Sequence, residues 1–394
     1  MQTTNNRNLL ILLHFVFFVS GILTVLIGQV LPIMAGGFAL NDLQAGYYFP
    51  AQFSGSILGT LATGWFGRRN NFVLATAIGC LCMAGGVTGM NLNWFEGSLA
   101  GFFVTGVGIG LTLPSTNMLV LELNPHRSAS ALSLLNFCWG LGAIFCKPFV
   151  DLTATRGSIF VTTLLLVVPL LMAAALILFL PKSEEVRPKS RDIAGSEKAD
   201  PVIWATPLAW TIAFFNFVHV GFESGIGGWL TTYADRVQGE PVVHLVSPTF
   251  LYFLFFVIGR GIAPALFRFL TEDQVLFIDL GLMLAGMLVI LSAGSLWWLG
   301  AGAALSGLGA SSVFPTNVSR FTDAFGPTST RRAAPLFICG TLGGATVTWM
   351  IGFVSDQEGN LRAGMFALIA CVAALLVIQV FLSTRPSVIR NSEK

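Results

Sequence analysis

Apolar runs of about 20 residues recur along the whole chain, and this recurrence constrains the fold more than any other feature. Such a run is what an α-helix needs to cross the hydrocarbon core of a bilayer. Since backbone groups inside a bilayer must bond within the chain, only helices and closed barrels span it. The chain is 54% hydrophobic and 10% charged, whereas soluble domains carry about 25% charged residues. The sequence therefore predicts an all-α polytopic membrane protein.

Proline residues, charge clusters and Asn/Gly turns divide the chain into twelve predicted spanning helices in two sets of six. A polar stretch from Pro181 to Pro201 separates the sets and is typical of a flexible linker. We predict an N-terminal half at 1–181, a cytoplasmic linker at 182–202, and a C-terminal half at 203–394 with a short cytoplasmic tail. The predicted spans are 8–34, 43–66, 71–90, 95–122, 128–151, 157–180, 206–233, 247–270, 273–292, 295–322, 332–355 and 361–383.

Lysine and arginine gather on one side of this arrangement. Sixteen of the 21 basic residues fall in the segments that share a side with the N-terminus, and this is the positive-inside pattern. It predicts a multi-pass protein of the cell (inner) membrane with both termini in the cytoplasm. The first apolar run is longer than a signal peptide's core of roughly 7–15 residues, so we expect it to be a retained helix.

The two predicted halves repeat each other in sequence. Gly21 and Gly28 recur as Gly221 and Gly228, at an offset of 200. The segment GVGIGLTLP, which ends at Pro114, matches GLGASSVFP, which ends at Pro315. Because six helices is an even number, both halves begin on the same side, and the predicted repeat is parallel.

Several motifs in these helices resemble a known family, the major facilitator superfamily. GWFGRRN (64–70) is similar to the family's signature loop between helices 2 and 3, although the loop's usual Asp is missing. Within the family, the chain most resembles the fucose:proton symporter branch. The motifs that carry this likeness are ESGIGGWLTTY (223–233), GRGIA (259–263), SVFPT (312–316) and GGATVTWMIGFVSD (343–356).

This resemblance implies two pseudo-twofold-related six-helix bundles that move a sugar by alternating access. Fucose permeases carry acids in helices 1 and 4 that serve proton coupling and sugar recognition. The chain has no acid at the centre of its first span or in the core of its fourth. The proton-coupling residues of that branch therefore do not carry over to this sequence.

Glu223 lies near the centre of a predicted span, where a charged side chain costs roughly 2.5–3.5 kcal/mol. Asn216, His219 and Glu223 share one helix face. An acid at this depth marks a functional site by default, so one interpretation is that Glu223 binds substrate or protons. Arg260 lies at a similar predicted depth, and the other interpretation is a structural ion pair between the two.

Other polar and aromatic residues at membrane depth are candidates for substrate binding. Amide side chains both donate and accept hydrogen bonds, which suits hydroxyl-rich solutes, and indole rings offer stacking faces for a sugar. The alternative is that small and polar residues simply pack helices together. Beyond the face of Glu223, the candidates are Gln52, Asn117, Asn136, Trp139, Trp229 and Asn317.

A set of charges recurs at the predicted cytoplasmic ends of the two halves. In the family, such clusters resemble latches that hold the cytoplasmic side shut. The alternative is a solvated rim worth about 0–1 kcal/mol per pair. The predicted gating residues are Arg68, Glu122 and Arg127 in the first half and Arg268, Asp323 and Arg331 in the second.

Together these features predict a secondary active transporter for a small polar solute, a sugar or sugar-like molecule first, with proton coupling through Glu223 as one interpretation of that acid. The alternatives are an exporter of amphiphilic or cationic compounds and a non-transporting membrane receptor. The sequence shows no metal-ligand spacing and no nucleophile with a base, so we expect no metal, cofactor or enzymatic activity. With a net charge of +2 we expect no nucleic-acid partner. The expected partners are the solute, protons and the lipid bilayer, around a monomeric protein.

Overall fold

The computed structural model of the chain describes residues 2–69, 71–124, 128–155, 158–179, 203–239, 247–326, 329 and 332–384. The chain forms two compact units, Met1–Gly195 and Ser196–Lys394, and each is described by itself. Every regular element in the described ranges is a helix, beside one isolated bridge between Thr155 and Ser158. The predicted all-α fold is confirmed, whereas the predicted linker at 182–202 lies outside the described residues.

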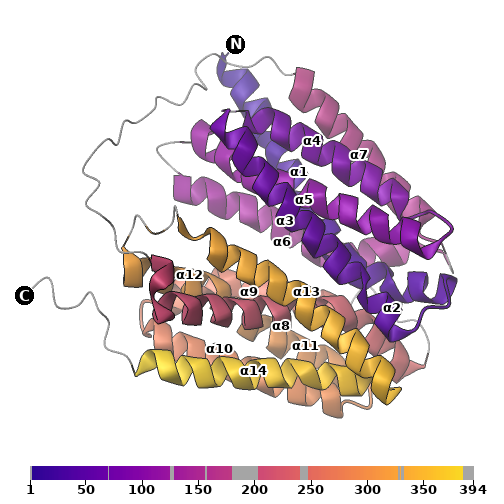
Figure 1. Cartoon of the computed structure of the whole chain (residues 1–394), viewed down its shortest axis with the longest axis vertical. Coiled ribbons are helices and arrows are strands. Elements are labelled where there is room, and N and C mark those ends of the chain that lie inside the picture. Colours follow the sequence, from indigo (N-terminus) through magenta and orange to yellow (C-terminus); the bar gives the residue numbers. More distant parts are fainter. Residues whose placement is uncertain are drawn as a thin grey trace, which may run out of the picture. The chain divides into compact units, whose positions relative to one another are not determined.

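The first unit holds six long helices and one short one (Figure 1). A capping box of Asn41 and Gln44 starts the short helix α2, which leads into the second span. The six predicted spans of this half match the six long helices to within six residues at each end, and the second predicted span, 43–66, also includes the short helix α2. The helices are α1 (Gln2–Gly37), α2 (Asp42–Gly46), α3 (Tyr48–Arg68), α4 (Phe72–Gly89), α5 (Phe95–Leu123), α6 (Ser128–Thr153) and α7 (Phe160–Phe179).

The second unit begins with a short 3-10 helix, η1 (Ile203–Ala205). Thr206 and Ser247 cap the helices that follow them, and in each case a proline occupies the first turn. The helices are α8 (Pro207–Gln238), α9 (Pro248–Leu266), α10 (Glu272–Ser292), α11 (Leu296–Ala310), α12 (Val313–Phe325), α13 (Ala334–Glu358) and α14 (Leu361–Ser383).

The same neighbour relations occur in both units, which confirms the predicted repeat. The first span packs against the fifth, as α1 with α6 and α8 with α13. The second packs against the fourth, as α3 with α5 and α9 with α11. The third packs against the fourth and the sixth, as α4 with α5 and α7, and as α10 with α11 and α14.

Matching glycines let these helices approach closely. A Cβ atom added to Gly106 would lie 2.0 Å from the backbone oxygen of Gln52, and one added to Gly307 would lie 2.2 Å from that of Tyr252. Side-chain atoms cannot sit so close to a backbone oxygen, so both positions require glycine. These contacts hold α3 against α5 and α9 against α11, and thereby fix the position of Tyr252.

The tenth predicted span, 295–322, is broken rather than continuous. It forms α11 and α12, with Ser311 and Ser312 between them. Pro315 has no N–H to donate to the carbonyl four residues earlier, which is that of Ser311. The backbone carbonyl of Ser311 is therefore left without its helical donor. In addition, the Ser311 hydroxyl donates to the Leu308 carbonyl at 2.6 Å, and such side-chain bonds to the backbone disfavour regular helix geometry.

Within the described residues, nine helices are long and apolar enough to cross a membrane. The spans outside that set are α3, α8 and the α11–α12 pair. They carry Gln52, Glu223 and Asn317, which are polar residues predicted to face the substrate. Candidate site residues thus occur on the spans outside this set as well as on spans within it, such as Asn117 on α5 and Arg260 on α9.

Candidate functional site

Glu223 lies on α8 with its carboxylate beside His219, one turn earlier. The Glu223 Oε2 atom is 3.6 Å from the His219 Nε2 atom, and the side chains are 21% and 1% exposed. Both ring nitrogens of His219 are buried and make no hydrogen bond in the described part of the chain. The predicted polar face of α8 therefore carries a partly exposed acid beside a buried imidazole.

A second face, on α9, carries Tyr252, Phe256 and Arg260 at spacings of four residues. The rings of Tyr252 and Phe256 stack with centroids 6.1 Å apart, and the Arg260 guanidinium carbon lies 4.2 Å from the Phe256 ring centroid. Tyr252 is completely buried, and its hydroxyl has no hydrogen-bond partner in the described ranges. Sequence reasoning missed Tyr252 and Phe256 because aromatic residues in an apolar run look like core.

Arg260 reaches the break between α11 and α12. Its Nε donates to the Ser311 carbonyl at 3.3 Å, and this is the carbonyl that Pro315 leaves free. In the first unit, Pro114 likewise frees the Gly110 carbonyl, and the Thr63 hydroxyl lies 3.2 Å from that oxygen. Both units thus satisfy the freed carbonyl with a side chain from their second span.

Arg260 and Glu223 interact electrostatically without forming an ion pair. Each contributes to the electrostatic environment of the other, and Tyr252 contributes to that of Arg260. Within the described residues, no nitrogen of Arg260 lies within ion-pair distance of the Glu223 carboxylate. The guanidinium contacts Ser311 and Phe256 instead, so the ion pair of the alternative interpretation is not formed between the described residues.

Three other candidates in the second unit lie between helices, and each is 0% exposed. The side-chain amide of Asn216 donates to the Leu336 carbonyl at 2.9 Å, and that of Asn317 donates to the Ile212 carbonyl at 3.1 Å. The Trp229 indole donates to the Thr348 carbonyl at 2.9 Å. In this structure Asn216, Asn317 and Trp229 therefore join α8 to its neighbours.

In the first unit, Thr24 on α1 brings two candidates together. Gln52 donates to the Thr24 carbonyl at 3.2 Å, and the Trp139 indole donates to the Thr24 hydroxyl at 3.4 Å. Asn136, one turn before Trp139, is exposed, and its amide donates to the carbonyl of Leu132 in its own helix. The oxygen of the Asn117 side chain is buried and unpaired in the described part of the chain.

The predicted gating charges make no ion pair among the residues that the structure describes. Arg68, Arg268 and Asp323 are exposed and Glu122 is half-buried. Arg127 and Arg331 lie outside the described residues. Another basic residue near the predicted cytoplasmic end, Arg320, donates to Asp273 at 2.9 Å and to Gln379 at 2.8 Å.

Asp279 on α10 is a buried acid that sequence reasoning missed. It is 5% exposed, and its carboxylate accepts a hydrogen bond from the Ser312 hydroxyl at the helix break. Both residues of the break therefore have side-chain partners from other helices: Arg260 bonds Ser311, and Asp279 bonds Ser312. An acid within an otherwise apolar predicted span was the signal that could have found it.

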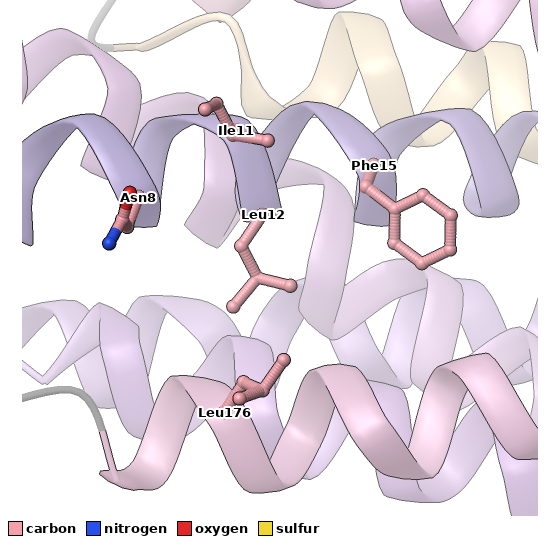
Figure 2. Close-up of a pocket in the computed structure, with 5 residues that line it drawn as sticks. All are labelled: Asn8, Ile11, Leu12, Phe15 and Leu176. Atoms are coloured by element: carbon pink, nitrogen blue, oxygen red, sulfur yellow. The ribbon is translucent and has the colours of Figure 1, made fainter.

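Described residues of the first unit also line hollows away from these faces. A groove of about 470 Å³ lies between α1 and α7. Figure 2 shows the residues that line it: Asn8, Ile11, Leu12, Phe15 and Leu176. Most of these side chains are apolar and exposed, which is typical of a surface that faces lipid. A second hollow of about 170 Å³ lies where α1, α4 and the start of α7 meet, and it is lined by Ile33, Met34, Gly37, Phe38, Met90, Asn91, Leu92, Asn93, Ser158 and Ile159.

Comparison with known proteins gives a family match over most of the chain. The sequence model of the Major Facilitator Superfamily matches residues 13–334. The 4-hydroxybenzoate transporter PcaK of Pseudomonas aeruginosa is 25% identical over 255 residues, which cover 61% of this chain and 57% of that protein. The chain thus spans little more than half the length of this relative.

A further relative and a solved structure extend the comparison. Sodium-dependent glucose transporter 1 of Xenopus laevis is 21% identical over 359 residues, covering 82% of this chain and 71% of that protein. The crystal structure of the E. coli fucose:proton symporter has a TM-score of 0.62 and 18% identity. It covers 97% of this chain and 100% of that chain, so the two share a fold.

Proposed function

Because the chain belongs to the Major Facilitator Superfamily, we propose that it moves a small polar solute across the cell membrane by alternating access of its two six-helix halves. Members of this family are transporters, so the general function is transport rather than an enzymatic reaction. The observation that carries the finer proposal is the pair of faces on α8 and α9. There a carboxylate, an imidazole, a phenol and a guanidinium meet within one half.

The first proposed solute is a sugar or sugar-like molecule. Hydroxyl groups pair with side chains that donate and accept, and in the second unit His219 and Tyr252 each keep a buried polar atom without a hydrogen-bond partner in the described ranges. Unpaired buried polar atoms are costly, so a hydroxylated solute would satisfy them. The likeness to a glucose transporter supports this class.

A second candidate is a small aromatic acid. The likeness to a 4-hydroxybenzoate transporter favours it, as does the guanidinium of Arg260 above the ring of Phe256. A guanidinium recognises a carboxylate by paired hydrogen bonds, and neighbouring aromatic rings offer stacking faces. Both candidates use the same faces on α8 and α9.

We assign proton coupling to Glu223. It is the acid of the α8 face, and its carboxylate is partly accessible within the second unit. A carboxyl group that exchanges a proton at this depth would couple transport to the proton gradient. Neutral Glu223 would correspond to the loaded site, and ionised Glu223 to the site after proton release.

The test is uptake into proteoliposomes by Glu223→Gln. The glutamine mimics the protonated acid, so we expect it to exchange solute across the membrane while losing accumulation driven by a pH gradient by at least about tenfold. Glu358→Gln, at an exposed acid that ends α13, is the matched control and should accumulate solute like the wild type. Full gradient-driven accumulation by Glu223→Gln would contradict the assignment, and binding without any movement would indicate a receptor.

A further inference from the structure

Arg260 has more hydrogen-bond donors than the protein uses. A guanidinium carries five N–H donors in a rigid fork and no acceptor. Only its Nε has a partner within the described residues, the Ser311 carbonyl at 3.3 Å. Its face rests 4.2 Å from the centroid of the Phe256 ring. The guanidinium is therefore positioned by these contacts, while both of its terminal amino groups have no partner among the described residues.

The depth of this guanidinium makes an anion its expected partner. Arg260 is half-buried in the second span of its unit, where charged side chains usually pair with one another or with a ligand. Glu223 influences it electrostatically, yet the two form no ion pair in the described ranges. Since a guanidinium fork matches a carboxylate bidentately, the two amino groups present a ready subsite for one.

The surroundings supply partners for the rest of such a solute. Tyr252 lies two turns before Arg260 on the same face, fully buried, with an unpaired hydroxyl. His219 offers a buried ring whose nitrogens make no hydrogen bond in the described part of the chain. Phenol and imidazole groups both donate or accept, which suits hydroxyl groups on the body of the solute.

We propose that Arg260 binds a carboxylate of the transported solute, and that this anion and a proton on Glu223 occupy the site together. The proposal rests on the transport function given above and names its substrate class, which is a small hydroxylated organic acid. A sugar acid and a hydroxybenzoate share this chemistry. The experiment below therefore tests a sugar acid and a hydroxybenzoate separately.

The charge balance links the two ligands. With Glu223 ionised, Arg260 and Glu223 cancel, and an incoming carboxylate meets a site without net charge and a like charge on Glu223. With Glu223 protonated, the site carries the unbalanced charge of Arg260, which favours the anion. One proton and one carboxylate thus enter as a neutral pair, and the cycle moves no net charge.

The titratable groups near Glu223 are consistent with this charge balance. On its own helix the nearby titratable group is His219, and α9 supplies Tyr252 and Arg260. Two residues further along α8, the side chains nearest to Gly225 are Val347 and Ile351 of α13 and Leu368 of α14, and all three are apolar. Among the described residues, Arg260 is the charged group from another helix that influences Glu223 electrostatically.

The experiment uses the full chain in proteoliposomes with four radiolabelled probes. Glucuronate is paired with glucose, and 4-hydroxybenzoate with 4-hydroxybenzyl alcohol, so that each acid has a neutral partner of the same body. An inside-alkaline pH gradient should drive accumulation of one acid and not of its neutral partner. A membrane potential imposed with potassium and valinomycin should leave that accumulation unchanged.

Variants separate recognition from coupling. Arg260→Gln should weaken binding of the acid by at least about 30-fold, as loss of one partner of a buried charge pair does. Arg260→Lys should recover only part of it, because lysine lacks the fork. Arg362→Gln, at an exposed arginine that begins α14, is the matched control and should bind like the wild type. Glu223→Gln should bind the acid with an affinity that no longer depends on pH, and this readout survives if Arg260→Gln fails to fold.

The outcomes distinguish this proposal from the proposed function. If a neutral probe accumulates as well as its acid, or if Arg260→Gln binds the acid normally, the carboxylate subsite is wrong and proton-coupled transport stands. Accumulation that follows the membrane potential would overturn the neutral pairing. If Glu223→Gln keeps full gradient-driven accumulation, the coupling role of Glu223 fails. If none of the four probes is bound or moved, the substrate class is wrong.

Discussion

Gly307 shows how one missing side chain positions a functional group. Its Cα faces the backbone oxygen of Tyr252, and an added Cβ would lie 2.2 Å from that oxygen. Tyr252 begins the face that continues through Phe256 to Arg260. The distance between α9 and α11 at Gly307 therefore governs where this whole face lies.

We expect Gly307→Ala to lower the thermal midpoint of unfolding, since overpacking at a helix contact costs about 1–3 kcal/mol. Gly281→Ala in α10 is the matched control because a Cβ there meets nothing within 4 Å. It should leave the midpoint unchanged or raise it, since alanine favours a helix by up to about 1 kcal/mol over glycine. Thermal unfolding of both purified variants measures the contrast, and equal midpoints would contradict the close approach.

Some residues of the site could be predicted from the sequence and others could not. Glu223 and Arg260 stand out because charge is rare in apolar spans, and their common neighbourhood follows from predicted depth. Their lack of a direct pair depends on Ser311 and Phe256, which hold the guanidinium from other directions. Asn216 and Asn317 look like site residues by composition, but tertiary packing turns both amides toward backbone carbonyls.

At the scale of elements, the fourth span of each unit behaves differently around equivalent prolines. α5 runs unbroken through Pro114, whereas α11 and α12 separate before Pro315. The sequence predicts one helix in both cases because the two motifs match in spacing. The break also involves Asp279, which comes from another helix, and such a partner is invisible to a local pattern.

Pro315→Ala tests whether this break serves transport. The new N–H can bond the Ser311 carbonyl and compete with Arg260, so the span should become more continuous. We expect a higher thermal midpoint, because an added backbone hydrogen bond contributes about 0.5–1.5 kcal/mol, together with a solute uptake rate lowered several-fold.

The matched variant for Pro315→Ala is Pro114→Ala, where the helix is already continuous and Thr63 serves the carbonyl. It should slow uptake less than Pro315→Ala does. Equal uptake rates in the two variants would argue against a role for the break in the second unit.

At the scale of the whole molecule, each unit has its own packed core and its own set of helix contacts. The repeat of those contacts was predictable because glycine spacing survives in both halves. The cytoplasmic placement of the termini and the monomeric state stay predictions. So does the latch formed by the rim charges, whose members Arg68, Glu122, Arg268 and Asp323 are unpaired in the described ranges.

If these charges hold the cytoplasmic side shut, Glu122→Ala and Asp323→Ala should each shift the population toward the inward-open state. A pair worth up to about 1 kcal/mol would change the population ratio by as much as about fivefold. Distances between spin labels at the predicted cytoplasmic ends of the two halves measure the shift. Glu358→Ala is the control, and distance distributions unchanged by all three variants would favour a solvated rim.

Pro114 and Pro315 each free a backbone carbonyl, and this feature bears on how the two halves can differ in sequence. In the first half the neutral Thr63 bonds the freed carbonyl, and in the second half the cationic Arg260 does. The two donors lie about one helical turn apart on equivalent helices. The unpaired carbonyl belongs to the duplicated fold, whereas the side chain that bonds it can differ between the halves. After duplication, one copy can therefore acquire a charge for its cargo while the helix packing of both copies is preserved.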